Sequence, residues 1–305
     1  MVDRKLLSDL VSKGYQGALK ENYSIAKYTT FKMGGNAQFF AEPRTKEDIA
    51  ILVRVANEQR YKVRVIGRGS NLLVTNGKVK GIVLHLDRNF AYLSEDAGLI
   101  TVGAGASFPK LVRFASKLNL GGIDFGFGIP GSVGGSIYMN AGMGSGLGIG
   151  DFVEELTAID VFGSQVTITK NQLQFSYRKS NLQSLGVLVI IQAKLKLQHL
   201  QREDINRNIA KLMTYRAETQ PLDKRSFGSI FKRGEGYTPG EVVESLGYKG
   251  SRLGGVEISR KHANFMINNG KANYKDAIAM LENIKNKAMM VRGIMLESEV
   301  ECWDD

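Results

Sequence analysis

The chain has 305 residues, of which 43% are hydrophobic and 23% are charged, a composition typical of a globular protein with two or three modest domains. The longest apolar run, Val187–Ile191, is too short to span a bilayer, and the N-terminus lacks the apolar core of a signal peptide, so we expect a cytoplasmic protein. A single cysteine, Cys302, excludes an internal disulfide, and three scattered histidines argue against a zinc site.

The net charge of +11 calls for an anionic partner. The 41 basic residues are spread along the chain among 30 acidic ones, without a helix-turn-helix or RNP pattern, which argues against nucleic acid. Small anions such as nucleotide diphosphates fit this charge equally well.

The N-terminal region predicts a helix within residues 1–25 and then a strand that ends near Pro43. A second helix follows, because Thr45 and Asp48 have the spacing of a capping box and apolar residues then recur at helical spacing. This helix leads into a β-branched strand, Val63–Ile66, and the arrangement resembles the start of a βαβ unit.

A glycine-rich turn, Gly67–Asn71, follows that strand. Successive small residues can direct several N–H groups at one phosphate, to which Ser70 adds a hydroxyl and Arg68 adds charge. An ordinary hairpin turn is the alternative, because Leu72–Val74 forms another predicted strand.

The middle of the chain predicts a mixed α+β unit. A helix over 109–118 has Ser107 as its N-cap and Gly121-Gly122 as its stop signal. Strands are predicted at 81–86, 99–102, 153–162, 165–169 and 186–198.

Residues 121–150 contain 12 of the 35 glycines, which points to a backbone that closely approaches a ligand. A flexible linker is the alternative, but apolar residues are regularly interleaved here. The spacing Gly126-x-Gly128-x-x-Gly131 imitates a dinucleotide-binding fingerprint. No apolar strand precedes it and Pro130 interrupts it, so a Rossmann domain is not expected.

A polar-faced helix begins near residue 201, where we place a domain boundary. A short helix with Pro239 at its first position follows and closes at Gly247. The last predicted elements are a helix around Ala277–Ile284 and a terminal strand, Gly293–Glu301.

Taken together, these motifs resemble those of the UDP-N-acetylenolpyruvoylglucosamine reductase family, in the family's order and over nearly the whole chain. The motifs are Thr29–Gly35, Gly67–Val74, Gly128–Gly142, Tyr177–Ser180, Gln220–Leu222, Gly228–Lys232, Lys261–Asn268 and Leu296–Val300. The chain's length resembles that of the shorter, type II members.

The resemblance implies an α+β fold with an FAD-binding unit of the vanillyl-alcohol-oxidase (PCMH) type and a C-terminal α/β substrate-binding domain. We expect the FAD-binding region over 1–200, in subdomains of roughly 1–90 and 91–200. The substrate-binding domain is expected over 201–290, and 291–305 as a terminal strand that carries a catalytic Glu.

The implied activity is NADPH-dependent reduction of UDP-N-acetylglucosamine enolpyruvate to UDP-N-acetylmuramate, a step of peptidoglycan precursor synthesis. FAD is expected to be tightly bound, with NADPH as co-substrate. Reduced FAD would deliver a hydride from N5 to the enol ether, and a serine would supply the proton. The partners are then small molecules, with no nucleic acid or membrane, and we expect a monomer.

By family match, Ser229 is the proton donor, and the Gly-Ser-Ile-Phe-Lys spacing favours it over Ser226. Arg178 would grip the substrate carboxylate with two hydrogen bonds. Glu299, favoured over Glu297 by motif position, would help only if it is protonated, or if it orients Arg178 or a water.

The remaining site residues implied by the resemblance bind FAD or the UDP-sugar. The predicted cofactor-binding residues are Gly67, Gly69, Ser70, Asn71, Leu72, Gly131, Ser132, Gly134, Gly135, Ile137 and Asn140. The predicted substrate-binding residues are Tyr177, Lys232, Arg233 and Asn264.

Two alternatives remain open from the sequence. One is an FAD-dependent oxidase or dehydrogenase of the same fold that acts on another small substrate, because a fold does not fix a function. The other is a non-catalytic nucleotide-sugar or nucleic-acid binder that uses the positive charge.

Overall fold

The computed structural model describes residues 4–86, 88–144 and 146–304 and contains two compact units. Unit 1 comprises the described parts of Met1–Tyr23, Ala37–Arg68 and Lys80–Leu212, and unit 2 those of Ser24–Asn36, Gly69–Val79 and Met213–Asp305. Within the described ranges, no helix has both the length and the apolar character needed to cross a bilayer.

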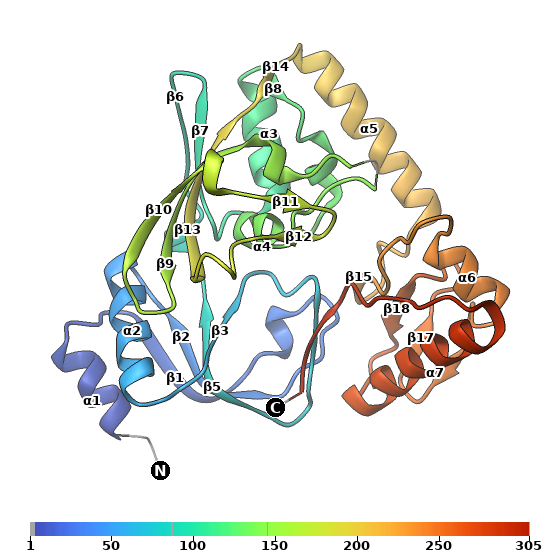
Figure 1. Cartoon of the computed structure of the whole chain (residues 1–305), viewed down its shortest axis with the longest axis horizontal. Helices are drawn as coiled ribbons and strands as arrows, with labels where there is room; N and C mark the ends of the chain where they lie inside the picture. The colour runs from blue at the N-terminus through green and yellow to red at the C-terminus, as the bar shows by residue number, and fades with distance from the viewer. Residues whose placement is uncertain (1–3, 87, 145, 305) are drawn as a thin grey trace. The chain divides into compact units, whose positions relative to one another are not determined.

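The first sheet of unit 1 has the strand order β1-β2-β5-β3 and is accompanied by two helices (Figure 1). Their bounds are Ala18–Ser24 (β1), Asn36–Glu42 (β2), Val63–Ile66 (β3), Lys78–His85 (β5), Arg4–Ser12 (α1) and Lys46–Glu58 (α2). The predicted capping box of α2 is confirmed, since Thr45 Oγ1 accepts the Asp48 N–H and Asp48 accepts the Thr45 N–H. Strand β3 pairs in parallel with β5 rather than with β2.

The second sheet of unit 1 is antiparallel, in the order β10-β9-β13-β7-β6. Its strands are Leu93–Asp96 (β6), Leu99–Gly103 (β7), Val153–Asp160 (β9), Gln165–Thr169 (β10) and Val187–Lys196 (β13). Two helices belong to this part, Phe108–Lys117 (α3) and Val133–Tyr138 (α4).

Helix α3 begins as predicted, because Ser107 is its N-cap and accepts the Lys110 N–H. It ends earlier than predicted. Asn119 takes the left-handed conformation just after the helix, with φ +58°, whereas Gly121 already belongs to strand β8, Leu120–Gly121. Asn adopts this conformation more readily than most residues, which explains why the glycines are not the stop.

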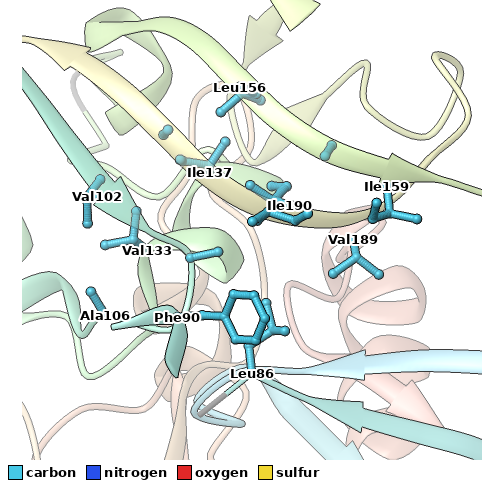
Figure 2. Packing of buried hydrophobic residues seen from close by; sticks show 14 of the residues in the cluster. Leu86, Phe90, Val102, Ala106, Val133, Ile137, Leu156, Ile159, Val189 and Ile190 are labelled. Carbon is cyan, nitrogen blue, oxygen red and sulfur yellow. The ribbon is translucent and has the colours of Figure 1, made fainter. Parts of the chain in front are cut away.

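The glycine-rich segment is part of the folded core of unit 1. Val133 and Ile137 are fully buried, and Figure 2 shows them among Val102, Leu156 and Ile190. The segment is therefore not a flexible linker. A 3₁₀-helix, Asp124–Gly128, precedes α4 in place of a strand, which agrees with the exclusion of a dinucleotide-binding fingerprint.

The smaller elements before helix α5 (Arg202–Thr219) are short strands and 3₁₀-helices, of which Ala26–Tyr28 belongs to unit 2. They are strands Phe175–Ser176 (β11), Lys179–Ser180 (β12) and Gln198–His199 (β14), and 3₁₀-helices Ala26–Tyr28, Arg88–Phe90, Ile149–Phe152 and Lys170–Gln172.

Unit 2 is built on an antiparallel sheet in the order β15-β18-β17-β16 (Figure 1). The bounds are Ser226–Ser229 (β15), Arg252–Leu253 (β16), Val256–Ile258 (β17), Phe265–Asn268 (β18), Pro239–Ser245 (α6) and Tyr274–Arg292 (α7). Helix α5, Arg202–Thr219, contains the change from one unit to the other, after Leu212. The predicted boundary near 200 lies before this helix.

A parallel pair, β4 (Leu72–Val74) and β19 (Glu301–Trp303), also belongs to unit 2. Because β4 pairs with β19 and not with β3, the turn between β3 and β4 is not a hairpin. The predicted terminal strand over 293–301 is wrong in its bounds. Helix α7 continues to Arg292, and β19 begins only at Glu301.

Candidate active site

The turn that follows β3 presents unpaired backbone donors. The N–H groups of Gly69, Ser70 and Asn71 donate to no acceptor in the described part of the chain. Gly69 has φ +55°, and a side chain there would collide with the backbone carbonyl of Tyr28. This turn has the features of an anion-binding backbone turn, as its sequence predicts.

The glycine-rich segment offers fewer free donors than its sequence suggests. The N–H groups of Val133, Gly134 and Gly135 donate to the Ala106 carbonyl (2.8 Å), the Ala104 carbonyl (2.9 Å) and the Ser132 hydroxyl (3.3 Å). Those of Gly131 and Ser132 have no acceptor among the residues described. Any backbone contact to a ligand through N–H groups in this turn would therefore come from Gly131 and Ser132.

Two predicted cofactor segments meet within unit 1. A Cβ atom at Gly67 would fall on the Ser132 hydroxyl, so only glycine permits this approach. Arg68 Nε also donates to the Pro130 carbonyl, at 3.2 Å. The end of β3 is thereby held against the start of α4.

The neighbouring glycines of α4 serve different purposes. A Cβ at Gly134 would lie 2.8 Å from Ala104 Cβ, which is too close, so this glycine is required for packing. A Cβ at Gly135 would meet only the Ser132 hydroxyl, at 3.3 Å, and otherwise faces open space. Packing within the protein therefore does not explain why residue 135 is a glycine.

Ser136 is a buried polar residue of this segment that no motif in the sequence singles out. The residue is 4% exposed, and its Oγ has no hydrogen-bond partner within the described ranges. A buried hydroxyl without a partner costs free energy unless a ligand or water completes it. By contrast, the predicted cofactor residue Ile137 directs its side chain into the core (Figure 2), which leaves only its backbone for a ligand.

Arg178 lies in the two-residue turn between β11 and β12, in unit 1. Its backbone has φ +54°, an unfavourable value for a residue with a side chain. Its guanidinium donates to the Gly142 carbonyl (3.2 Å) and lies 5.1 Å from the ring centre of Tyr177. The predicted catalytic arginine is thus beside the glycine-rich segment.

Ser229 ends strand β15 in unit 2, where its Cα is paired with that of Phe265 across a bulge. The hydroxyl of the competing residue, Ser226, accepts the Gly228 N–H at 3.1 Å. The hydroxyl of Ser229 has no hydrogen-bond partner in the described part of the chain. This difference favours Ser229 as the reactive serine.

Glu299 is held beside Ser229 by its backbone. Its N–H donates to the Ile230 carbonyl (2.8 Å), and its carbonyl accepts from Asn71 Nδ2 (2.9 Å). The competing carboxylate, Glu297, forms an ion pair with Lys232, at 2.5 Å. Lys232 is the more buried partner, with its side chain 14% exposed.

Asn264, a predicted substrate residue, is buried and contacts the backbone of the Ser229 segment. Its side-chain amide both accepts the Phe231 N–H and donates to the Phe231 carbonyl, each at 2.9 Å. Burial, with the charge of Lys249, lowers the pKa of His262, and its Nδ1 accepts the Asn264 N–H at 3.2 Å. Arg233, by contrast, is exposed.

The predicted site residues therefore form two sets. Unit 1 brings together Gly67, the segment from Gly131 to Asn140, and the Tyr177-Arg178 turn. Unit 2 brings together Asn71, the Ser229–Lys232 segment and Glu299, with Asn264 behind them.

Two family models match the chain. One is described as an FAD binding domain and matches residues 37–169. The other is described as the C-terminal domain of UDP-N-acetylenolpyruvoylglucosamine reductase and matches residues 220–303. The predicted α+β fold, an FAD-binding unit of the PCMH type followed by a C-terminal substrate-binding domain, is confirmed by these matches.

Similar proteins cover nearly the full length. A UDP-N-acetylenolpyruvoylglucosamine reductase of Desulforamulus reducens is 38% identical over 94% of each chain. One of Moorella thermoacetica is 33% identical over 100% of this chain and 99% of its own. The crystal structure of the Thermus caldophilus enzyme aligns with a TM-score of 0.80 at 31% identity, and the alignment covers 95% of this chain and 100% of that one.

Proposed function

The chain belongs to the UDP-N-acetylenolpyruvoylglucosamine reductase family, and from this we propose that it reduces UDP-N-acetylglucosamine enolpyruvate to UDP-N-acetylmuramate with NADPH, for peptidoglycan precursor synthesis. The observation that carries the proposal is the arrangement in unit 2, where a serine with an unpaired hydroxyl lies beside the backbone of Glu299. A flavin oxidase acting on another small substrate has no need for this pair together with Arg178.

The residues present fit FAD. The unpaired N–H groups of Gly69, Ser70 and Asn71 suit its diphosphate. The orphaned Ser136 hydroxyl and the open space at Gly135 suit a flat ring system laid against α4. When bound, FAD supplies the hydride chemistry, by which the electrons of NADPH reach the substrate.

Arg178 stabilises the charge that develops on the substrate. Hydride addition to the enol ether leaves negative charge on the neighbouring carbon, which spreads into the carboxylate. A planar guanidinium can grip that carboxylate with two parallel hydrogen bonds. The strained backbone at Arg178 is consistent with a side chain selected for this task rather than for the turn.

Ser229 then gives its proton to that carbon, which completes the reduction. A serine is a weak acid, so the oxygen left behind needs positive charge nearby. Lys232, three residues later and paired with Glu297, is a cation of this segment. Lys232, Arg233 and Tyr177 are our candidates to bind the UDP-sugar, while Asn264 holds the segment through Phe231.

A steady-state assay tests the function as a whole. We expect NADPH oxidation by the purified flavoprotein only when the enolpyruvyl substrate is added. The parent UDP-N-acetylglucosamine, which lacks the double bond, should give no oxidation above background. Oxidation that is equally fast with both nucleotide sugars would contradict the proposed substrate.

Gly135→Ala tests whether α4 forms part of the cofactor site. Because alanine is favoured over glycine in a helix, the apoprotein should gain about 0.5–1 kcal/mol in its free energy of unfolding. FAD affinity should nevertheless fall by about tenfold or more, which is about 1.4 kcal/mol, since the new methyl group occupies the open space. Chemical denaturation and flavin titration measure the two effects.

Gly134→Ala is the matched control, one residue away in the same helix. Its methyl group would press on Ala104, so we expect a loss of about 1–3 kcal/mol in stability from overpacking. Unchanged FAD affinity in Gly135→Ala would show that this face of α4 does not contact the cofactor.

Glu299→Gln tests whether Glu299 acts as a charged carboxylate or as a neutral group. A carboxylate next to the developing charge would oppose it, so we propose that Glu299 acts as a neutral hydrogen-bonding group. Glutamine should then keep at least about a tenth of kcat, whereas Glu299→Ala should lose about 100-fold, as for removal of a donor to a developing oxyanion. Equal losses in the two variants would mean that the carboxylate itself is needed.

A further inference from the structure

Asn140, predicted to bind the cofactor, has its side chain committed elsewhere in unit 1. The residue is 7% exposed. Its Nδ2 donates to the Ser176 carbonyl at 2.9 Å, and its Oδ1 accepts the Gly150 N–H at 3.0 Å. A carbonyl only accepts and an N–H only donates, so these partners fix the orientation of the amide.

The surrounding backbone is shaped around this side chain. Asn140 has φ +44°, a conformation that asparagine tolerates better than most residues. A side chain at Gly148 would collide with the amide of Asn140, so glycine is required there for the amide to fit. The positive φ of Asn140 and the absence of a side chain at Gly148 thus allow a partly buried hydrogen bond to Ser176.

Ser176 is the residue at the base of the turn that carries Arg178. Strands β11 and β12 have two residues each, and so short a hairpin has little stability of its own. Hydrogen bonds hold it to the glycine-rich segment. Asn140 makes one of them, and two more run from Ser180 Oγ to the Tyr138 carbonyl (2.7 Å) and from Arg178 Nη1 to the Gly142 carbonyl (3.2 Å).

The bond from Arg178 to Gly142 uses the guanidinium that we assign to the substrate. If the guanidinium turns to a carboxylate, that bond is lost, whereas the links from Asn140 and Ser180 remain. The link from Asn140 is the less exposed of these two and attaches two residues before Arg178. We propose that Asn140 is a positioning residue, which places Arg178 for the reaction and does not bind the cofactor through its side chain.

This inference rests on the role proposed for Arg178. A turn displaced by about 1 Å can cost about 100-fold in rate, because the hydrogen bonds to the reacting group depend on distance and angle. The flavin and NADPH need not sense that displacement. The inference therefore predicts a defect confined to the step that involves the enolpyruvyl substrate.

Asn140→Asp is the variant that isolates the link. Aspartate tolerates a positive φ and still accepts the Gly150 N–H, but its carboxylate cannot donate to Ser176. We expect unchanged flavin content and an unchanged rate of flavin reduction by NADPH. The rate at which the substrate reoxidises reduced enzyme should fall by about 10- to 100-fold.

Asn181→Asp is the matched control in the same stretch of chain. Asn181 makes the same kind of pair, from Nδ2 to the Gln172 carbonyl (2.8 Å) and from the Gln174 N–H to Oδ1 (2.9 Å), but to residues outside the glycine-rich segment. We expect it to change neither half-reaction. Should N140D fail to fold, Asn140→Gly, which takes the positive φ without strain, replaces it in the comparison.

The Arg178→Lys background tests whether Asn140 acts through Arg178. If it does, N140D should add little to the loss of reoxidation rate that Arg178→Lys already causes. If the two residues act independently, the fold-losses of the two single variants should multiply in the double variant. Three outcomes would each overturn the positioning role. N140D could lose its flavin, N140D could be reoxidised at the normal rate, or the fold-losses could multiply in the double variant. A harmless Arg178→Lys would instead overturn the role proposed for Arg178.

Discussion

Ser229→Ala is expected to keep FAD and to be reduced by NADPH at the normal rate, yet to lose about 10²- to 10⁴-fold in reoxidation by the enolpyruvyl substrate. The reason is that only the second half-reaction requires a proton on carbon. The hydroxyl of Ser229 is unpaired among the described residues, so its removal should disturb the fold little. Anaerobic stopped-flow measurement of each half-reaction separates the two effects.

Ser226→Ala is the matched control on the same strand. Its hydroxyl accepts the Gly228 N–H and shapes the bulge, so we expect a stability loss of about 1 kcal/mol and a normal rate of reoxidation. If Ser226→Ala slowed reoxidation and Ser229→Ala did not, the proton donor would have been assigned to the wrong serine.

Arg178→Lys is expected to lower kcat/KM for the enolpyruvyl substrate by about 10²- to 10³-fold, although the charge is kept. An ammonium group is a point charge and cannot make two parallel hydrogen bonds to a carboxylate. Reduction of the flavin by NADPH should be unaffected. Steady-state kinetics with each substrate varied in turn measures the loss.

The control for Arg178 is the next residue, Lys179, which is exposed and whose side chain has no hydrogen-bond partner in the part of the chain that the structure describes. Lys179→Ala removes a positive charge from the same hairpin and should leave kcat/KM within about twofold, because an exposed charge contributes little. Equal losses in both variants would mean that general positive charge, and not a positioned guanidinium, is what the site uses.

Local signals in the sequence were sufficient where an element depends on its own residues. The capping box of Thr45 and Asp48, the N-cap Ser107 and the β-branched strand Val63–Ile66 are all found as predicted. The pairing of β4 with β19 joins segments more than 200 residues apart, and no local sequence pattern predicts it. The bounds of the terminal strand fail for this reason, because β19 is defined by its partner and not by its own pattern.

In the candidate site, too, the sequence predicts residue types better than it predicts which atoms they contact. The sequence identified the glycine-rich segments and their neighbouring polar residues. It could not distinguish Gly134, required by Ala104, from Gly135, which faces open space. Nor could it show that the amides of Asn71 and Asn140 hold other parts of the chain. Such roles depend on which backbone atoms lie nearby, and this is fixed only in the folded protein.

The central claim is that electrons pass from NADPH through FAD to the enolpyruvyl double bond. The most direct test is anaerobic addition of one equivalent of NADPH to the wild-type flavoprotein, followed by the substrate. We expect the absorbance of oxidised flavin to disappear in the first step and to return in the second, with one equivalent of UDP-N-acetylmuramate formed. The opposite result is that the flavin stays reduced when the substrate is added and is reoxidised only when oxygen is admitted. That result would contradict the proposed reaction and favour an oxidase.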